Sequence, residues 1–224
     1  MGDVTAARRR GERGDAAGLG EILARVAAGE YPPADGAVEV LPPPSARDWG
    51  VIAFTAHHVV FADVDPAWVR DRLPEGDLSA PLNPPFLTAL CAASGRRVNN
   101  VDLLTLAPAL PGPAPLALRP ATGADHPRVR RAGHYRDDVR VWTCPEGVVI
   151  LGRGVAGRWE VAVEVAEGHR GRGVGRALAA AARHLLPAGT PLWAQVAPGN
   201  AASVRAFLAA GYTPVGAEAL LVAH

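Results

Sequence analysis

The feature that most limits the fold is a glycine- and arginine-rich turn between a strand pattern and a helix pattern. The turn reads RGRGVG over residues 170–175, and Arg176 follows it. Residues 159–165 alternate like a half-buried strand, and an alanine- and leucine-rich helix is expected to run to about residue 186. Glycines let backbone N–H groups converge at a helix start, where an anion is favoured. The segment therefore predicts a pyrophosphate site between a strand and a helix.

Two alternatives apply to this turn. Three glycines also make a tight strand-to-helix connection without any ligand. A dinucleotide-binding fingerprint fails in both registers, because Gly171 and Gly173 lead to Arg176, while Gly173 and Gly175 lead to Leu178. No acidic residue lies about 20 positions downstream to hold a ribose, which weakens the case for a nucleotide-dependent oxidoreductase.

All 23 basic residues are arginine, and the chain contains no lysine. A Walker phosphate loop and Schiff-base chemistry both need a lysine, so both classes are excluded. The formal net charge of +1 does not indicate a nucleic-acid-binding surface. The run Arg8–Arg10 is interpreted as a solvated tail.

Cysteine usage and hydropathy bear on the compartment. Cys91 and Cys144 lie in unrelated contexts without metal-ligand spacing, which favours a reducing compartment and argues against a metal site. The sequence has no apolar run of about 18 residues and no secretory signal pattern. We therefore expect a cytoplasmic protein, a monomer or homodimer, with neither a membrane nor a nucleic acid as partner.

Proline-rich stretches suggest three parts. Residues 1–48 are predicted to form a leader with one short helix, 49–112 an N-terminal α/β lobe, and 113–224 a C-terminal domain, with the boundary in the segment PALPGPAPL. One hypothesis makes the N-terminal lobe a degenerate copy of the C-terminal fold. The expected class is α/β, with a mixed, mostly antiparallel sheet flanked by helices.

Periodicity and turn residues predict the individual elements. The first half is expected to hold a helix at 21–26, one or two strands within 51–64, helices at 66–72 and 85–93, and a strand at 98–107. The second half is expected to hold strands at 116–119, 139–143, 148–153, 159–165 and 192–196, a helix at 126–135, a last helix begun by Asn200 and ended by Gly211, and closing strands within 215–222.

Two blocks of the C-terminal part resemble the GNAT superfamily of N-acetyltransferases. Arg170-x-x-Gly173-x-Gly175 is similar to the family signature of Gln or Arg, two residues, Gly, one residue, and Gly or Ala. The second block, WAQVAPGNAASVRAFLAAGY, resembles the family's strand, the Asn at a helix start and the Gly-aromatic pair at its end. The resemblance covers about residues 113–224 and implies a GNAT-type fold.

The resemblance also implies a ligand and a reaction. Acetyl-CoA would be the cosubstrate, an amine of a small molecule or protein the acceptor, and the acyl group would pass directly in a ternary complex without a metal. The pantetheine would lie where strand 159–165 splays from strand 192–196. The implied cofactor-binding residues are Val163 and Val165 for the pantetheine amides, Arg170, Gly171, Arg172, Gly173, Val174, Gly175 and Arg176 for the pyrophosphate, and Asn200 for the pantetheine arm.

The acid–base positions depart from the family pattern. Trp159 and Gln195 occupy two positions where relatives carry a glutamate base, and Phe207 replaces the usual tyrosine acid. In a regular strand Glu160 and Glu164 share one face, so both are predicted as catalytic residues.

Other roles stay open for these glutamates and for the protein. Glu160 and Glu164 can instead lie at a solvated edge or pair with Arg153 and Arg158. His134 or Tyr135, or proximity with a low-pKa acceptor, can replace them in catalysis. Alternatively, the protein binds acyl-CoA without transferring it, as a sensor or partner module.

Overall fold

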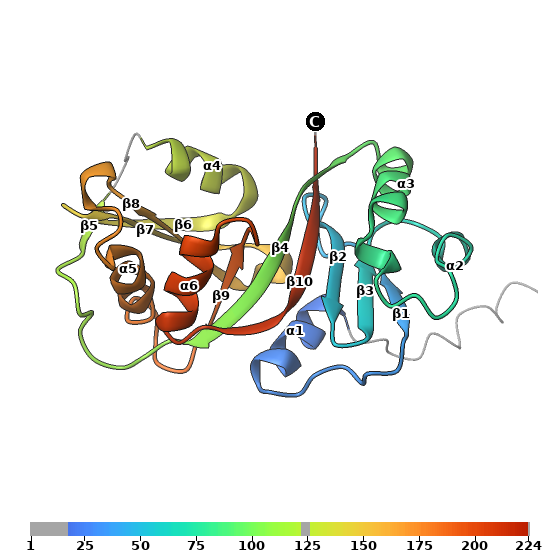
Figure 1. Ribbon diagram of the computed structural model, residues 1–224, viewed down its shortest axis with the longest axis horizontal. Coiled ribbons are helices and arrows are strands. Elements are labelled where there is room, and N and C mark those ends of the chain that lie inside the picture. Colours follow the sequence, from blue (N-terminus) through green and yellow to red (C-terminus); the bar gives the residue numbers. More distant parts are fainter. Residues whose placement is uncertain (1–17, 122–125, 224) are drawn as a thin grey trace, which may run out of the picture.

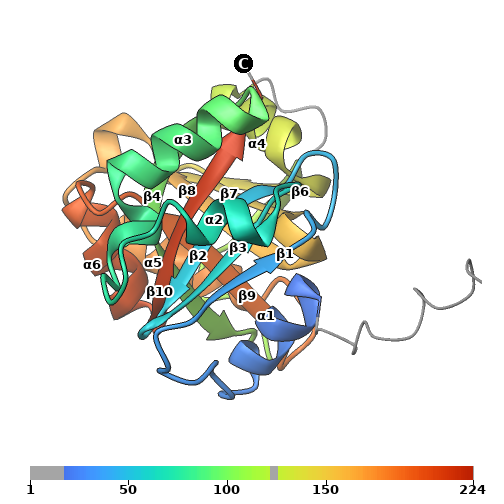
Figure 2. The same ribbon diagram turned by 90° about the vertical axis from the view of Figure 1, so that its right-hand side faces the viewer.

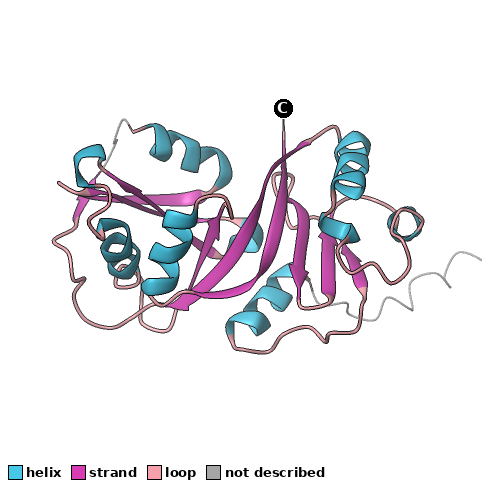
Figure 3. Ribbon diagram, in the orientation of Figure 1, coloured by secondary structure: helices cyan, strands magenta, loops and turns pink. Residues whose placement is uncertain are grey.

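The computed structural model describes residues 18–121 and 126–223, whose strands form one ten-stranded sheet (Figure 1). The strand order is β1-β3-β2-β10-β4-β9-β8-β7-β6-β5. Among the described strands, β1–β3 and β8–β9 are the parallel pairs, and the other neighbours are antiparallel. The predicted fold class is confirmed, and Figure 3 shows the sheet running through the molecule.

The elements of the described chain have the following bounds. The strands are β1 (Val38–Leu41), β2 (Trp49–Phe54), β3 (His57–Phe61), β4 (Arg97–Pro108), β5 (Arg119–Ala121), β6 (Asp137–Cys144), β7 (Gly147–Arg153), β8 (Trp159–Val165), β9 (Pro191–Val196) and β10 (Thr213–Val222). The helices are α1 (Leu19–Ala27), α2 (Pro66–Arg70), α3 (Pro84–Ser94), α4 (Pro127–Tyr135), α5 (Val174–Ala182) and α6 (Ala201–Ala209), with 3-10 turns η1 (Ala80–Leu82), η2 (Val155–Gly157) and η3 (Glu167–His169).

Helices cover both faces of the sheet (Figures 1 and 2). On β7, Leu151 belongs to the apolar cluster under α5 and α6, whereas its neighbour Ile150 packs with Ala132 of α4. Successive strand residues face opposite sides, so α4 lies on the face opposite α5 and α6. Helix α1 shares the α4 face, because its buried residues cluster with Trp193 of β9. No helix in the described ranges is both long and apolar enough to cross a bilayer.

Strand β4 joins the two halves of the chain. It pairs with β10 along one edge and with β9 along the other, so Leu104 lies opposite Gly216 and also opposite Gln195. The segment predicted as an N-terminal lobe, 49–112, therefore contributes a strand between two strands of the segment 113–224. The division into these two parts stays a prediction about folding units.

Local sequence accounts for several helix ends. The Asp65 side chain accepts a hydrogen bond from the backbone N–H of Ala67 at 2.7 Å and caps α2. Asn200 likewise caps α6, accepting from the N–H of Ser203 at 3.1 Å. Gly95 ends α3 in the left-handed conformation that glycine permits.

The structure also departs from some expected bounds. Strand β1 lies within the predicted leader and was missed, because it is a four-residue edge strand whose partner, β3, is distant in sequence. Helix α5 ends at Ala182, and β10 is one strand with two register shifts where several were expected. The run Arg8–Arg10 lies outside the described residues.

Candidate functional site

Strands β8 and β9 touch only at one end. β8 pairs with β7 along its whole length, from Trp159 to Val165, but pairs with β9 only through Trp159–Leu192 and Glu160–Trp193. From residue 161 onward the two strands diverge. The predicted splay is confirmed, and it leaves one edge of β8 open to an added extended ligand.

A cavity of about 1020 Å³ lies at this divergence. Asn200, Ser203 and Phe207 of the α6 region line it on one face of the sheet, while Ala132 and Tyr135 of α4 line it on the other. The cavity thus connects the two faces through the gap between β8 and β9. Ligands that approach from opposite faces could meet there.

The glycine-rich turn has the conformation that its sequence predicts. Gly171 and Gly173 adopt positive φ angles of 74° and 79°, and α5 begins immediately afterward at Val174. A Cβ atom on Gly175 would lie 3.5 Å from the Ala206 side chain and 3.6 Å from that of Val165. These are ordinary van der Waals distances, so at Gly175 helix α5 packs against α6 and the end of β8.

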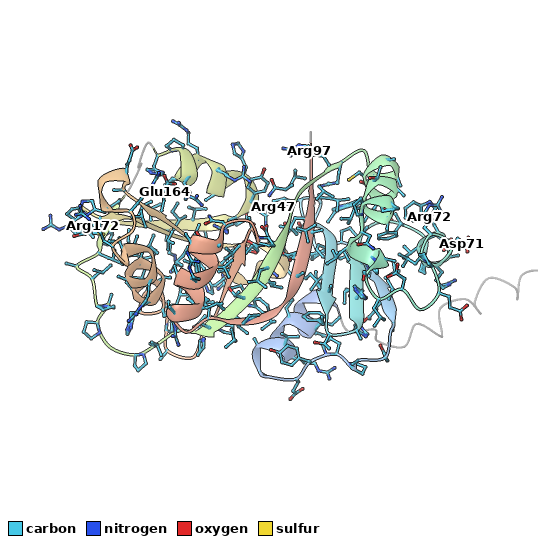
Figure 4. The ribbon with its side chains drawn as sticks, viewed as in Figure 1. Arg47, Asp71, Arg72, Arg97, Glu164 and Arg172 are labelled. Carbon is cyan, nitrogen blue, oxygen red and sulfur yellow. The ribbon has the colours of Figure 1, made fainter. Side chains whose placement is uncertain are left out.

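Three arginines surround this turn and are exposed. Arg170, Arg172 and Arg176 make no side-chain hydrogen bond or ion pair within the described ranges. Figure 4 shows Arg172 at the end of the molecule beside α5, far from Arg72 on the opposite side. Guanidinium groups and the N-terminus of a helix are both groups that can bind phosphate.

The other predicted cofactor positions lie along the gap. Val163 and Asn200 line the cavity, and Val165 packs beside Gly175 at its outer end. Because the Asn200 side-chain oxygen already caps α6, its amide nitrogen is the group left to meet a ligand. Of the predicted cofactor residues, Val163 and Asn200 thus lie at the cavity, and Val165 lies against the turn before α5.

Glu160 is buried at the cavity in a cluster of charged groups. Its side chain is 3% exposed and accepts hydrogen bonds from Arg158 and Arg136, each at 2.9 Å. Burial opposes ionisation, but the two guanidinium groups outweigh it and hold the pKa of Glu160 below its ordinary value. Glu160 is therefore ionised and fully engaged. The predicted alternative partner Arg153 instead stacks over the Trp159 ring.

A second buried carboxylate, Glu218 of β10, completes this cluster. Arg158 donates to Glu218 at 2.7 Å, and the amide of Gln195 donates to Glu218 at 2.6 Å and to Glu160 at 3.3 Å. One Glu218 oxygen has no partner in the described part of the chain. Burial raises the pKa of Glu218, and repulsion from Glu160 adds to this, against the attraction of Arg158.

Glu164 is partly exposed and connects β8 to α4. Arg128 donates to its carboxylate at 2.6 Å, and that hydrogen bond lowers the pKa of Glu164. Figure 4 shows Glu164 beside α4. Since Arg136 follows α4 directly and binds Glu160, both predicted catalytic glutamates hold this helix against β8.

Asp102 of β4 is a cavity carboxylate that sequence reasoning missed. It lies opposite Glu218 in the β4–β10 register, so both side chains are on the face that carries Glu160 and Gln195. Asn100 donates to it at 2.7 Å, and no ion pair to it forms in the described chain. Burial raises the pKa of Asp102. The sequence feature that could have identified Asp102 is its position as the one acidic residue within the apolar run VDLLTLA.

Other residues considered from sequence are placed as follows. His134 and Tyr135 line the cavity on α4, and Phe207 lines it from α6. Tyr212 is buried, packs edge-on against Phe207, and donates to the carbonyl of Ala179 at 3.4 Å. Burial raises the pKa of Tyr212, and its side chain packs in the core.

The comparison with protein families agrees with this geometry. Residues 125–212 match the model of the acetyltransferase (GNAT) family. The resemblance to the GNAT family is confirmed over this segment. The matched GNAT segment spans α4 through α6 and includes the glycine-rich turn, the diverging strands and Asn200.

Solved structures with some similarity to this chain include two GNAT proteins. A GCN5-related N-acetyltransferase from Kribbella flavida is 19% identical with a TM-score of 0.42, covering 62% of this chain and 64% of its own. A structure assigned to the GNAT family from Novosphingobium aromaticivorans DSM 12444 is also 19% identical, with a TM-score of 0.36, covering 58% of this chain and 67% of its own. The chain thus spans less than two thirds of the Kribbella protein. No curated protein matches the sequence significantly.

Proposed function

We propose that the protein is an acetyl-CoA-dependent N-acetyltransferase that acts by direct transfer to an amine in a ternary complex. The observation that carries this proposal is the cavity at the β8–β9 divergence, which reaches both faces of the sheet. A thioester that enters along the α5–α6 side would meet an amine that enters under α4. Transfer then needs proximity and orientation more than covalent activation.

The charge at the turn before α5 supports binding of the phosphate groups of coenzyme A. The turn before α5 offers backbone N–H groups, and Arg170, Arg172 and Arg176 are exposed around it. Along the gap, the open edge of β8 at Val163 supports hydrogen bonds to an extended amide-containing arm. Acetyl-CoA is the proposed cosubstrate, and the chemistry requires no metal.

The proton of the attacking amine needs an acceptor. Glu160 and Glu164 stay the sequence-based candidates, but their arginine partners stabilise the ionised forms and weaken both as bases. Asp102 forms no ion pair in the described chain, and burial raises its pKa in the same cavity against the opposing charge of Arg131. We propose Asp102 as the general base, and Glu160 and Glu164 as residues that fix α4 over the acceptor site.

Calorimetry with acetyl-CoA, followed by thiol release with a panel of amines, tests the proposal. We expect binding of acetyl-CoA and release of free thiol that depends on an added amine. Absence of acetyl-CoA binding overturns the proposal. Binding without turnover on any amine favours a sensor or partner module instead, a role in which Arg136 and Arg158 would simply neutralise Glu160.

A further inference from the structure

The acceptor side of the cavity is bounded by two walls of different origin. Helix α4 contributes Arg128, Arg131 and Tyr135, whose spacing places them on one side of the helix. The facing wall comes from the first residues of β4, including Arg97 and Asp102, with residues from the start of β2 and the end of β10. Figure 4 shows Arg47 and Arg97 between the two halves of the molecule.

Positive charge exceeds negative charge along these walls. The described lining contains six arginines and three carboxylates. The arginines are Arg47, Arg96, Arg97, Arg128, Arg131 and Arg136, and the carboxylates are Asp48, Asp102 and Glu160. In a partly enclosed cavity such an excess attracts anions.

Four of these arginines already have strong partners. Arg47 pairs with Asp48 at 2.8 Å, and Arg96 donates to backbone carbonyls, the shortest being that of Ala46 at 2.6 Å. Arg128 pairs with Glu164, and Arg136 pairs with Glu160. These four therefore hold the walls together and add little free charge.

Arg97 and Arg131 are different. Neither forms an ion pair in the described chain, and Arg97 is exposed at the cavity. Arg131 donates to the side-chain oxygen of Asn99 at 3.1 Å and lies over the Tyr135 ring, so its guanidinium reaches from α4 to the facing wall. Its remaining N–H groups are available for a planar anion.

Two further polar groups lie at this end of the cavity. Asp102 receives one amide hydrogen bond and no ion pair, and the buried indole N–H of Trp49 has no partner in the described ranges. The charged groups that a ligand can reach here are thus the guanidinium groups of Arg97 and Arg131 and the carboxylate of Asp102, on which the charge of Arg131 acts. A molecule with both an ammonium group and an anionic group complements this set.

We propose that the acceptor is a small amine that carries an anionic group, a carboxylate or a phosphate, bound by Arg97 and Arg131 while Asp102 binds the amine. This inference rests on the proposed acetyltransferase function and names its substrate class. The anion would fix the acceptor in the cavity, and the amine would point toward the β8–β9 divergence.

Matched acceptor pairs test the charge requirement. Each α-amino acid is compared with its own amide, and O-phosphoethanolamine with ethanolamine, by thiol release at saturating acetyl-CoA. We expect kcat/KM for the anionic member to exceed that of its neutral partner by about 10- to 100-fold, the value of a charged hydrogen-bond pair. The carboxylate and phosphate pairs distinguish the two kinds of anion.

Variants connect the preference to the two arginines. Arg97→Gln and Arg131→Gln should each raise KM for the anionic acceptor about tenfold and leave KM for the neutral partner unchanged. Arg97→Glu should reverse the preference toward neutral or cationic amines. Arg70→Gln, an exposed arginine on α2 outside the cavity, is the matched control and should change neither value.

Two results overturn the inference. Equal or better turnover of the neutral members would refute it while the acetyltransferase function stands. If no amine is acetylated, the proposed function fails on that result alone, and the same pairs are then titrated directly by calorimetry in the presence of coenzyme A. Equal binding of acid and amide there refutes the inference, whereas tighter binding of the acid, lost in Arg97→Gln, supports it.

Discussion

Arginines do two different jobs in two regions of this molecule. In the buried cluster, Arg158 joins Glu160 and Glu218, and all three are nearly inaccessible to water. In the turn before α5 and at the start of that helix, Arg170, Arg172 and Arg176 are exposed and unpaired within the described chain. An arginine that forms ion pairs with buried carboxylates therefore stabilises the fold, whereas an exposed arginine without an ion pair remains available to a ligand.

The largest effect on stability should come from removing an ion pair in the buried cluster around Arg158. Arg158→Met removes the cation between two buried carboxylates, so the free energy of unfolding should fall by about 3–5 kcal/mol. Urea denaturation followed by circular dichroism measures it. The double variant Arg158→Met/Glu218→Gln should recover part of the loss. A loss below about 1 kcal/mol in the single variant would contradict a dry, charge-balanced cluster.

The same contrast between paired and unpaired groups applies to the cavity carboxylates. Asp102→Asn should lower kcat/KM about 100-fold or more, because it removes the proposed base, without changing acetyl-CoA affinity. In the wild type, kcat/KM should fall as pH drops through the raised pKa of Asp102, and the variant should lose this acid limb.

A matched substitution at an exposed acid serves as control. Asp71→Asn, on the far side of the molecule (Figure 4), should leave the pH–rate profile intact. If Glu160→Gln lowers turnover and Asp102→Asn does not, Glu160 is the base.

Substitutions in the exposed arginines beside α5 should change the affinity for acetyl-CoA and not the free energy of unfolding. Arg170→Gln/Arg172→Gln should weaken acetyl-CoA binding about 10-fold or more, with the free energy of unfolding unchanged within about 0.5 kcal/mol. Calorimetry and urea denaturation measure the two quantities. Wild-type affinity should fall with added salt more steeply than that of the variant. Loss of stability without loss of affinity would reverse the assignment of roles.

The smallest effect concerns the exposed pair Arg128–Glu164. Glu164→Gln should cost less than about 1 kcal/mol of unfolding free energy, because the pair is partly solvated. The folded-state pKa of Glu164 is lowered, so its contribution is present above the ordinary value of 4.5 and is lost as pH falls below it. Acidification should therefore destabilise the wild type slightly more than the variant. If acidification lowers the unfolding free energy of the variant more than that of the wild type, the proposed role of the Arg128–Glu164 pair is contradicted.

Much of the C-terminal half was predictable, because its signals are local. Strand β8 has the predicted bounds, since alternation from Trp159 to Val165 is regular and turns flank it. Asn200 was predicted as a cap from its position before a helix pattern, and the structure confirms it. The glycine-rich turn was equally recognisable, because left-handed positions at a strand–helix junction favour glycine.

The electrostatic environment of the site was not predictable, because it depends on contacts distant in sequence. Glu160 meets Arg136 and Glu218 only because β8, α4 and β10 converge. Neither Asp102 nor the position of β4 between β9 and β10 follows from local pattern, since strand order in a sheet is set by the whole fold. Sequence therefore identified the candidate carboxylates on β8 and Arg158 as a partner of Glu160, but not the contributions of Arg136 and Glu218 to its environment.

The place of β10 in the sheet has a consequence for biosynthesis. β10 lies between β2 and β4, yet it follows every other described element along the chain. While a ribosome is still making the polypeptide, β2 and β4 each lack a neighbour until residues 213–222 emerge. The central sheet then closes late, through contacts of long sequence separation, which favours slow folding and leaves two apolar strand edges open to chaperones meanwhile.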